Sequence, residues 1–196
     1  SLVEPTHSVS LPAGAQVFTD LGEVVLTPST VQLPAGMTLD AGGIGKGFAA
    51  DLIVAAVMAS GARGVMVSMS GDVVVSGESP QPGGWLLGVE NPFDESENIE
   101  IVRLSEGAIV TSSQRKKRFG DAHHLIDPRT KKSVITSAQT VSVIADTGAQ
   151  AEALAKAGFM RPASEFLAWL PSVDSAGMVI DAAGSRAVSS NWSDYR

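Results

Sequence analysis

The sequence LDAGGIGKGFAAD at residues 39–51 places four glycines and one lysine within six residues, directly before a run of helix-forming residues. Because glycine has no Cβ, backbone N–H groups in such a loop can approach an anion closely. The helix expected over residues 46–60 directs its unpaired N–H groups and the positive end of its dipole at the same point. The stretch therefore predicts a loop–helix unit that either binds a phosphate group or forms a tight turn without a ligand.

Two familiar phosphate-binding motifs fit this loop poorly. A Walker loop needs Ser or Thr after its lysine, whereas Lys46 is followed by Gly47. Residues 43–47 read G-x-G-x-G, and a lone match of that kind is weak evidence for a dinucleotide fingerprint. Both interpretations of the loop therefore stay open at this point.

Composition narrows the class of protein. The 196 residues can form one domain with a substantial core, and 44% hydrophobic with 18% charged residues is ordinary for a globular chain. The absence of cysteine excludes disulfides, thiolate metal sites and a cysteine nucleophile. A net charge of −7 makes the chain a poor nucleic-acid binder, although residues 115–118 are all basic. No apolar run reaches the roughly 18 residues that indicate a membrane span.

Most of the chain consists of short apolar runs separated by turn residues, which predicts many short strands. The expected strands cover residues 23–26, 30–33, 64–70, 73–76, 85–90, 99–104, 108–111, 140–145, 177–181 and 187–189. Two main helices are expected over residues 46–60 and 147–159, and a shorter one over residues 163–169. This order predicts an α+β fold with a largely antiparallel sheet and the two main helices packed on it.

Several residues define the ends and faces of these helices. Gly61 is the expected C′ residue of the first helix, and Asp146 or Thr147 is the expected N-cap of the second. The apolar residues that share one face of the first helix are Phe48, Leu52, Ala55, Ala56 and Ala59.

Two strand ends carry polar residues that suit ligand contacts. Residues 70–72 read Ser-Gly-Asp between two apolar strands, a pattern more often found in a bulge or turn. The strand at residues 108–111 runs into the hydroxyl side chains of Thr111, Ser112 and Ser113, which suit either ligand contacts or turn caps.

Two further stretches each have a functional and a structural interpretation. His124, beside the Asp127-Pro128 turn, could act as a general base near neutral pH, or it could be a partly buried histidine whose ring bonds a neighbouring carbonyl. Glu152 and Lys156 are four residues apart on one helix face. They could form an exposed pair worth about 0.2–0.5 kcal/mol, or they could face the anion site.

Taken together and in order, these stretches resemble the ApbE family, the FAD:protein FMN transferases. The family pattern L-D-x-G-G-I-x-K-G-[FY]-A-x-D is matched at residues 39–51, and the histidine motif H-I-I-D-P-R-T-G is matched from residue 124 to 130. A Gly-Asp step with its strand, a Trp-x-x-G strand and an A-I-x-T-S segment are matched at residues 71–77, 85–92 and 108–112. The likeness covers about residues 23–190.

The resemblance implies a T-fold-related, two-layer architecture. It implies that residues 1–196 form a single domain, the larger C-terminal part of the family domain, without that domain's N-terminal portion. It further implies that the chain transfers FMN from FAD to a Thr or Ser hydroxyl of an acceptor protein and releases AMP, with Mg²⁺ at the pyrophosphate. Many family members are exported lipoproteins, but no residue here indicates a compartment.

The resemblance also implies roles for individual residues. His124 and Asp127 would be catalytic, with His124 in the motif that activates the accepting hydroxyl. The residues that would bind FAD are Gly42, Gly43, Gly45, Lys46, Gly47, Asp72, Thr111, Ser112 and His124. The residues at the metal positions are Gly45, Glu152 and Lys156.

The chain departs from the family pattern at these metal positions. Family helices usually present Asp and Thr to the metal, where this chain has Glu152 and Lys156. A protonated lysine cannot ligate a metal, but its ammonium could take part of the cation's place and pair with phosphate oxygens. Ser113 and Lys131 also stand where the family has glycine. Two alternatives to transfer therefore remain: a noncatalytic FAD- or nucleotide-binding domain, and a pyrophosphatase that converts FAD to FMN and AMP.

Overall fold

A computed structural model describes residues 22–196 of the protein apart from 116–117, 120–121, 128 and 131. Its centre is a six-stranded sheet in the order β14-β13-β12-β7-β4-β3, in which every neighbouring pair is antiparallel. These strands are β3 (Gly64–Met69), β4 (Asp72–Gly77), β7 (Gly107–Ser113), β12 (Ala138–Ala145), β13 (Ala176–Asp181) and β14 (Arg186–Val188). The predicted α+β fold with a largely antiparallel sheet is confirmed.

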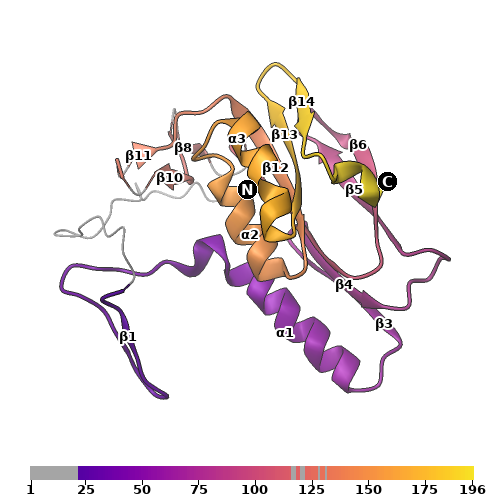
Figure 1. Ribbon diagram of the computed structural model, residues 1–196, viewed down its shortest axis with the longest axis horizontal. Coiled ribbons are helices and arrows are strands. Elements are labelled where there is room, and N and C mark those ends of the chain that lie inside the picture. Colours follow the sequence, from indigo (N-terminus) through magenta and orange to yellow (C-terminus); the bar gives the residue numbers. More distant parts are fainter. Residues whose placement is uncertain (1–21, 116–117, 120–121, 128, 131) are drawn as a thin grey trace, which may run out of the picture.

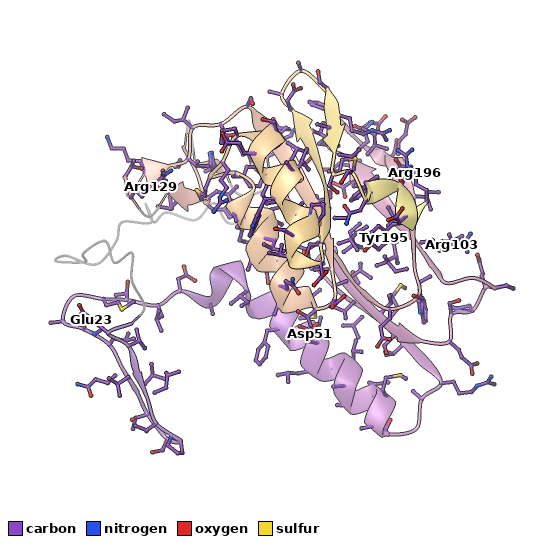
Figure 2. All side chains as sticks on the ribbon, viewed as in Figure 1. Glu23, Asp51, Arg103, Arg129, Tyr195 and Arg196 are labelled. Carbon is purple, nitrogen blue, oxygen red and sulfur yellow. The ribbon has the colours of Figure 1, made fainter. Side chains whose placement is uncertain are left out.

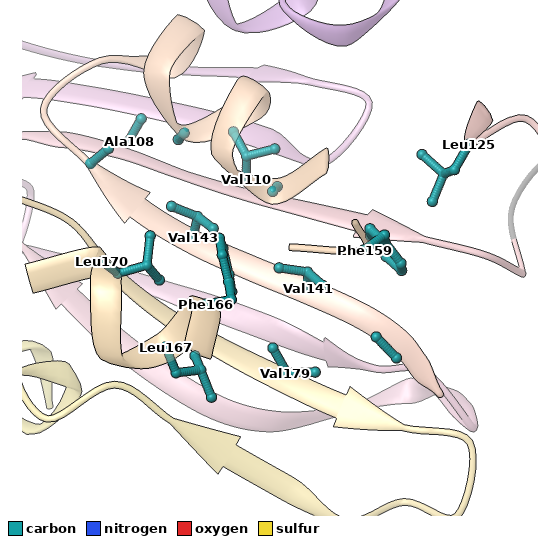
Figure 3. Packing of buried hydrophobic residues seen from close by; sticks show 14 of the residues in the cluster. Ala108, Val110, Leu125, Val141, Val143, Phe159, Phe166, Leu167, Leu170 and Val179 are labelled. Atoms are coloured by element: carbon teal, nitrogen blue, oxygen red, sulfur yellow. The ribbon is translucent and has the colours of Figure 1, made fainter. Parts of the chain in front are cut away.

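The helices of the described part of the chain cover one face of this sheet (Figure 1). They are α1 (Gly45–Ala59), α2 (Gly148–Ala157) and α3 (Ala163–Trp169). Val110, Val141 and Val143 project from the central strands into the core beneath them, where they meet Phe159 and Phe166 (Figure 3). Alternate residues of each strand therefore face the helical layer.

A long hairpin covers the other face of the sheet. It consists of β5 (Trp85–Asn91) and β6 (Asp94–Leu104). Trp85 of β5 packs in a second core with Ile144 and Met178 of the sheet, and Trp192 of the short helix η3 (Trp192–Tyr195) is buried in the same core. The sequence predicted two layers, the sheet and the helices. The β5–β6 hairpin adds a third layer on the other face of the sheet.

Small hairpins and 3₁₀ turns complete the described chain. The hairpins are β1 (Val25–Leu26) with β2 (Val31–Gln32), β8 (Arg118–Phe119) with β9 (Ala122–His123), and β10 (Ile126–Asp127) with β11 (Lys132–Ser133). The 3₁₀ turns are η1 (Ala41–Gly43) and η2 (Leu170–Val173). Figure 1 shows the β1–β2 hairpin projecting away from the sheet and helices, whereas η1 leads directly into α1.

Helix ends lie within two residues of the expected positions. Thr147 is the N-cap of α2, because its hydroxyl accepts a hydrogen bond from the N–H of Gln150 at 3.1 Å. Gly61 has a φ of +95°, and its N–H bonds the carbonyl of Met58 at 3.0 Å, as a C′ glycine does. Helix α3 has the expected boundaries. Of the basic run at residues 115–118, Lys116 and Lys117 lie outside the described residues.

The buried face of α1 is not the apolar face that the sequence predicted. Phe48 and Leu52 of the predicted face are 54% and 55% exposed. The buried residues of α1 are instead Gly47, Ala50 and Val54. Small residues occupy this side because α2 crosses it closely, so the spacing of the large apolar side chains indicated the wrong face.

Gly47 and Asp51 fix the contact between α1 and α2. A Cβ at Gly47 would lie 2.1 Å from the carbonyl oxygen of Gly148, so only glycine fits there. One turn later, the carboxylate of Asp51 accepts hydrogen bonds from the N–H groups of Gly148 at 2.7 Å and Ala149 at 3.0 Å (Figure 2). These N–H groups belong to the first turn of α2, so Asp51 caps that helix together with Thr147.

We expect Gly47→Ala to lower the free energy of unfolding by about 1–3 kcal/mol, because the added methyl group meets backbone atoms that cannot move aside. Gly45→Ala is the matched control, since its Cβ would meet nothing closer than the Cβ of Ala41 at 3.7 Å. Urea unfolding compares the two variants with the wild type. Equal stability of both variants would contradict the close approach of α1 and α2.

Candidate anion-binding site

Two lysines and two carboxylates meet where α1 begins. The Lys46 ammonium forms an ion pair with Asp72 and lies 3.4 Å from Oε1 of Glu152. Lys156 Nζ lies 3.1 Å from the same Oε1 atom. The second oxygen of Glu152, Oε2, accepts a hydrogen bond from the N–H of Gly47 at 2.9 Å. Glu152 thus joins α1 to α2, and Lys46 links Asp72 of β4 to the same cluster.

A tight turn places Asp72 in this cluster. Ser70 and Gly71 have φ values of 54° and 92° and form a two-residue loop between β3 and β4, in which Met69 pairs with Asp72. Two consecutive residues with positive φ are typical of a type I′ hairpin turn. Asp72 therefore begins β4, on the same side as Val74, which faces the helical layer. The turn interpretation of residues 70–72 holds, and the turn also positions a carboxylate.

Consecutive residues of β7 point to opposite faces of the sheet, which separates two predicted site residues. Ser112 faces the helices, and its Oγ lies 3.4 Å from Lys156 Nζ. Thr111 faces the other way, and its Oγ1 lies 2.8 Å from the hydroxyl of Ser142 on β12. The structure therefore brings Ser112 to the lysine cluster, and it does not bring Thr111 there.

The Gly-rich loop lies against the Lys156 side chain. The Asp40 carboxylate caps η1 by accepting a hydrogen bond from the N–H of Gly42 at 2.6 Å. A Cβ at Gly43 would lie 3.3 Å from Cδ of Lys156, so the glycine leaves room for the lysine to cross the loop. Gly45 is the first residue of α1, directly before Lys46. Of the loop residues predicted to bind a ligand, Gly43, Lys46 and Gly47 contact other members of the cluster.

Burial acts differently on the two carboxylates. Asp72 is 2% exposed, and burial raises the pKa of its carboxyl above the ordinary value even though Lys46 opposes this shift. Burial would also raise the pKa of Glu152, which is fully buried. The hydrogen bond from Gly47 and the Lys156 and Lys46 ammonium groups outweigh burial, so its pKa lies below the usual range. Glu152 is therefore an ionised carboxylate held by cations.

The histidine motif begins at the end of the β8–β9 hairpin, on a different element from the lysines. His123, not His124, is the buried histidine: its Nε2 lies 3.0 Å from the carbonyl oxygen of Val134, and its Nδ1 accepts a hydrogen bond from the N–H of Leu125 at 3.3 Å. Because a carbonyl can only accept, Nε2 carries the proton and the ring is neutral. Of the two histidines, His123 is therefore the one whose ring bonds a neighbouring carbonyl. It holds in place the segment that carries the half-buried His124.

Asp127 is bonded within its own turn. Its two carboxylate oxygens accept hydrogen bonds from Nε and a terminal nitrogen of Arg129 at 3.0 and 2.9 Å, and the backbone N–H of Arg129 adds a third bond at 2.9 Å. The side-chain hydrogen bonds to Arg129 hold the pKa of Asp127 below its ordinary value. Figure 2 shows Arg129 at the β10–β11 hairpin. This arrangement suits a positioning role for Asp127 better than proton transfer.

A cleft of about 480 Å³ separates the β10–β11 hairpin from the connection between α2 and α3. Arg129 and Lys132 line one side, and Phe159, Met160 and Arg161 line the other. The lining combines basic and apolar side chains, and the volume falls in the range of ligand pockets. No sequence motif indicates this cleft, because Phe159 ends an apolar helical segment and the residues opposite it, Arg129 and Lys132, are distant in the chain.

Within the described residues, no group of three or more histidine, aspartate or glutamate side chains could hold a metal ion. The described helices are also too short or too polar to cross a membrane.

We expect Glu152→Gln to destabilise the protein by about 3–5 kcal/mol near neutral pH, because two ammonium groups lose the carboxylate they share. The fold lowers the pKa of Glu152, so its contribution is complete above the ordinary pKa of a glutamate and is lost as the pH falls through the lowered value. The stability difference from wild type should therefore shrink toward acid pH. Urea unfolding over a pH series measures it.

Two variants serve as comparisons for this pH series. The first is Asp72→Asn. Because the fold raises the pKa of Asp72, the wild type should lose stability relative to this variant as the pH rises through the raised value. This pH dependence is opposite in direction to that expected for Glu152. Glu97→Gln changes an exposed residue of β6 and should leave the profile unchanged. A Glu152→Gln difference that is independent of pH would contradict the lowered pKa.

Comparison with known proteins identifies the relatives of this chain. The FAD:protein FMN transferase of Treponema pallidum is 33% identical in an alignment 159 residues long that covers 74% of this chain and 44% of the relative. That of Klebsiella pneumoniae is 28% identical in an alignment 152 residues long that covers 70% of this chain and 46% of the relative. The chain thus spans about half the length of the curated relatives that it matches.

Solved structures show the same fold. The ApbE protein of Thermotoga maritima superposes with a TM-score of 0.78 at 24% identity, and the flavin transferase ApbE of Vibrio cholerae with 0.74 at 20%. Each match covers 88% of this chain and 58% of the solved chain. The family model of the ApbE family matches residues 7–180. With a match over most of its length and the fold in agreement, this chain belongs to the ApbE family.

Proposed function

We propose that this chain carries the phosphate-binding and catalytic part of an FAD:protein FMN transferase. The observation that supports the proposal most is the lysine cluster against the Gly-rich loop at the start of α1, in a chain of the ApbE family. The substrates are FAD and a Thr or Ser hydroxyl of an acceptor protein. The curated relatives carry this activity in their names.

The proposed reaction is a phosphoryl transfer. The hydroxyl oxygen of the acceptor attacks the phosphorus on the FMN side of the FAD pyrophosphate, a new P–O bond forms, and the bridging P–O bond breaks. AMP leaves with the bridging oxygen, and the hydroxyl proton passes to a base. Such reactions are accelerated mainly by positioning the groups and by stabilising negative charge on the phosphate oxygens and the leaving group.

Lys46 and Lys156 can supply that stabilisation. Their side chains are 40% and 20% exposed, so each remains partly in contact with solvent while its ammonium pairs with a buried carboxylate. The start of α1 adds the positive end of a helix dipole at the same place, where the N–H of Gly47 already bonds Glu152. An incoming pyrophosphate would share the two ammonium groups with Asp72 and Glu152.

His124 is the proposed base for the acceptor hydroxyl, since an ordinary histidine accepts a proton near neutral pH. His123 fixes its backbone through the bonds to Val134 and Leu125, and Asp127 fixes the following turn through Arg129. The cleft beside this hairpin is the proposed place for a ring of FAD.

Magnesium, which the family resemblance implies, finds no suitable ligand set among the described residues. Oε1 of Glu152 lies beside two ammonium groups, and its Oε2 accepts the N–H of Gly47. Asp72 is paired with Lys46. Both oxygens of Glu152 and one oxygen of Asp72 therefore already face an ammonium or an N–H group, an environment that suits an anion better than a hard cation. No step of the proposed reaction is therefore routed through a metal.

This engagement of the carboxylates favours one alternative, a domain that binds FAD without transferring FMN. The third possibility, hydrolysis of FAD to FMN and AMP, uses water in place of the acceptor hydroxyl. Release of AMP distinguishes all three. Transfer releases AMP only with acceptor and labels it, hydrolysis releases AMP without acceptor, and simple binding releases none.

We expect the protein to label a Thr- or Ser-bearing acceptor flavoprotein covalently with FMN when it is mixed with FAD, as in-gel flavin fluorescence would show. His124→Ala should reduce the labelling rate about 100-fold or more, the usual contribution of a general base. Glu97→Gln, on the opposite layer, is the control and should label at the wild-type rate. An unlabelled acceptor, or full activity of His124→Ala, would contradict the proposal.

A further inference from the structure

We infer that the ammonium of Lys156 fills the cation position of this site, so that the chain binds a phosphate ligand there without a divalent metal. The inference deepens the proposed function, on which it rests for the identity of the ligand, a pyrophosphate. The arrangement of charges around Glu152 carries it.

Lys156 lies where a bridging cation would lie. Its Nζ is 3.1 Å from Glu152 Oε1 on its own helix and 3.4 Å from Ser112 Oγ at the end of β7, so it links oxygens from two elements. An ammonium has three N–H donors, of which these two oxygens take two among the described contacts. The remaining donor can serve an anion.

The Gly-rich loop leaves room for the Lys156 side chain. Lys156 passes the Gly-rich loop at Gly43, where a Cβ would lie only 3.3 Å from its Cδ. A Cβ at position 43 would require the lysine side chain to shift by a few tenths of an ångström. The glycine that suggested anion binding in the sequence therefore also accommodates the lysine.

A divalent ion would have to displace this lysine. Glu152 is fully buried, and its two oxygens already receive two ammonium groups and one backbone N–H. An added ion beside Glu152 would also stand beside Lys46 and Lys156, and like charges at such short range repel. A protonated lysine also offers no lone pair to a metal, since metal ligands must be deprotonated.

The two lysines together suit a pyrophosphate. They flank Glu152 from α1 and α2, and both are partly exposed beside the loop whose glycines admit a ligand. Charge-assisted bonds from an ammonium to phosphate oxygens are among the stronger hydrogen bonds in proteins. Lys156 would thus supply one positive charge where a metal would supply two, and Lys46 would supply another.

Titration with Mn²⁺, followed by the electron paramagnetic resonance signal of the free ion, tests the cation position. The wild type should show no Mn²⁺ binding that depends on Glu152. Lys156→Thr removes the ammonium and adds a hydroxyl oxygen, so it should gain a Mn²⁺ site about tenfold tighter or more than any wild-type site. The double variant Lys156→Thr, Glu152→Gln should lose the gained site. Wild-type Mn²⁺ binding that Glu152→Gln abolishes would overturn the inference.

Calorimetric titration with inorganic pyrophosphate tests the anion. Its affinity should be the same in EDTA and in Mg²⁺ within about twofold, and Lys156→Met should weaken it about tenfold or more, as expected for the loss of one charged hydrogen bond. Far-UV circular dichroism checks that each variant is folded. Binding that requires Mg²⁺, or no binding in either buffer, would overturn the inference.

These outcomes separate the inference from the proposed function. Metal-free pyrophosphate binding without labelling of an acceptor would leave the inference standing and remove the transfer activity. Labelling that requires Mg²⁺, together with a Glu152-dependent Mn²⁺ site in the wild type, would support the transfer activity and overturn the inference.

Discussion

The buried carboxylate of Glu152 is the interaction on which the site depends. One of its oxygens receives the N–H of Gly47 and the other lies beside the ammonium groups of Lys46 and Lys156. It therefore joins α1 to α2 at the point where the Gly-rich loop ends. A buried carboxylate is tolerated only when it is fully paired, so the lysines stabilise the fold. The proposed phosphate site would use the same four side chains, because Asp72 completes the set.

Much of the fold could be predicted from the sequence because its signals are local. Turn residues and short apolar runs defined the strands, and Thr147 and Gly61 defined helix ends through their own hydrogen bonds. The buried face of α1 could not be predicted in this way. It depends on how closely α2 approaches, which is set by Gly47 and Gly148, residues about a hundred positions apart. The covering of the sheet's second face by the β5–β6 hairpin is likewise a long-range outcome.

The site shows the same division between local and long-range information. Lys46, Asp72, Ser112, Glu152 and Lys156 were all expected, and the structure brings them together. Thr111 was expected beside Ser112, but strand alternation turns it to the other face, where it meets Ser142. No sequence motif predicted the cleft that Phe159 and Met160 line, since its walls come from segments that meet only in the folded chain.

The chain belongs to the ApbE family, but it has Lys156 where helices of the family usually have Thr. We propose that the ammonium of Lys156 replaces a metal at the centre of the proposed phosphate site. A crystal structure grown with FAD and Mn²⁺, analysed by the anomalous signal of manganese, tests this most directly. We expect Lys156 to lie between Glu152 and the pyrophosphate, with no anomalous peak there. A manganese ion bound to Glu152, with Lys156 turned away, would contradict it.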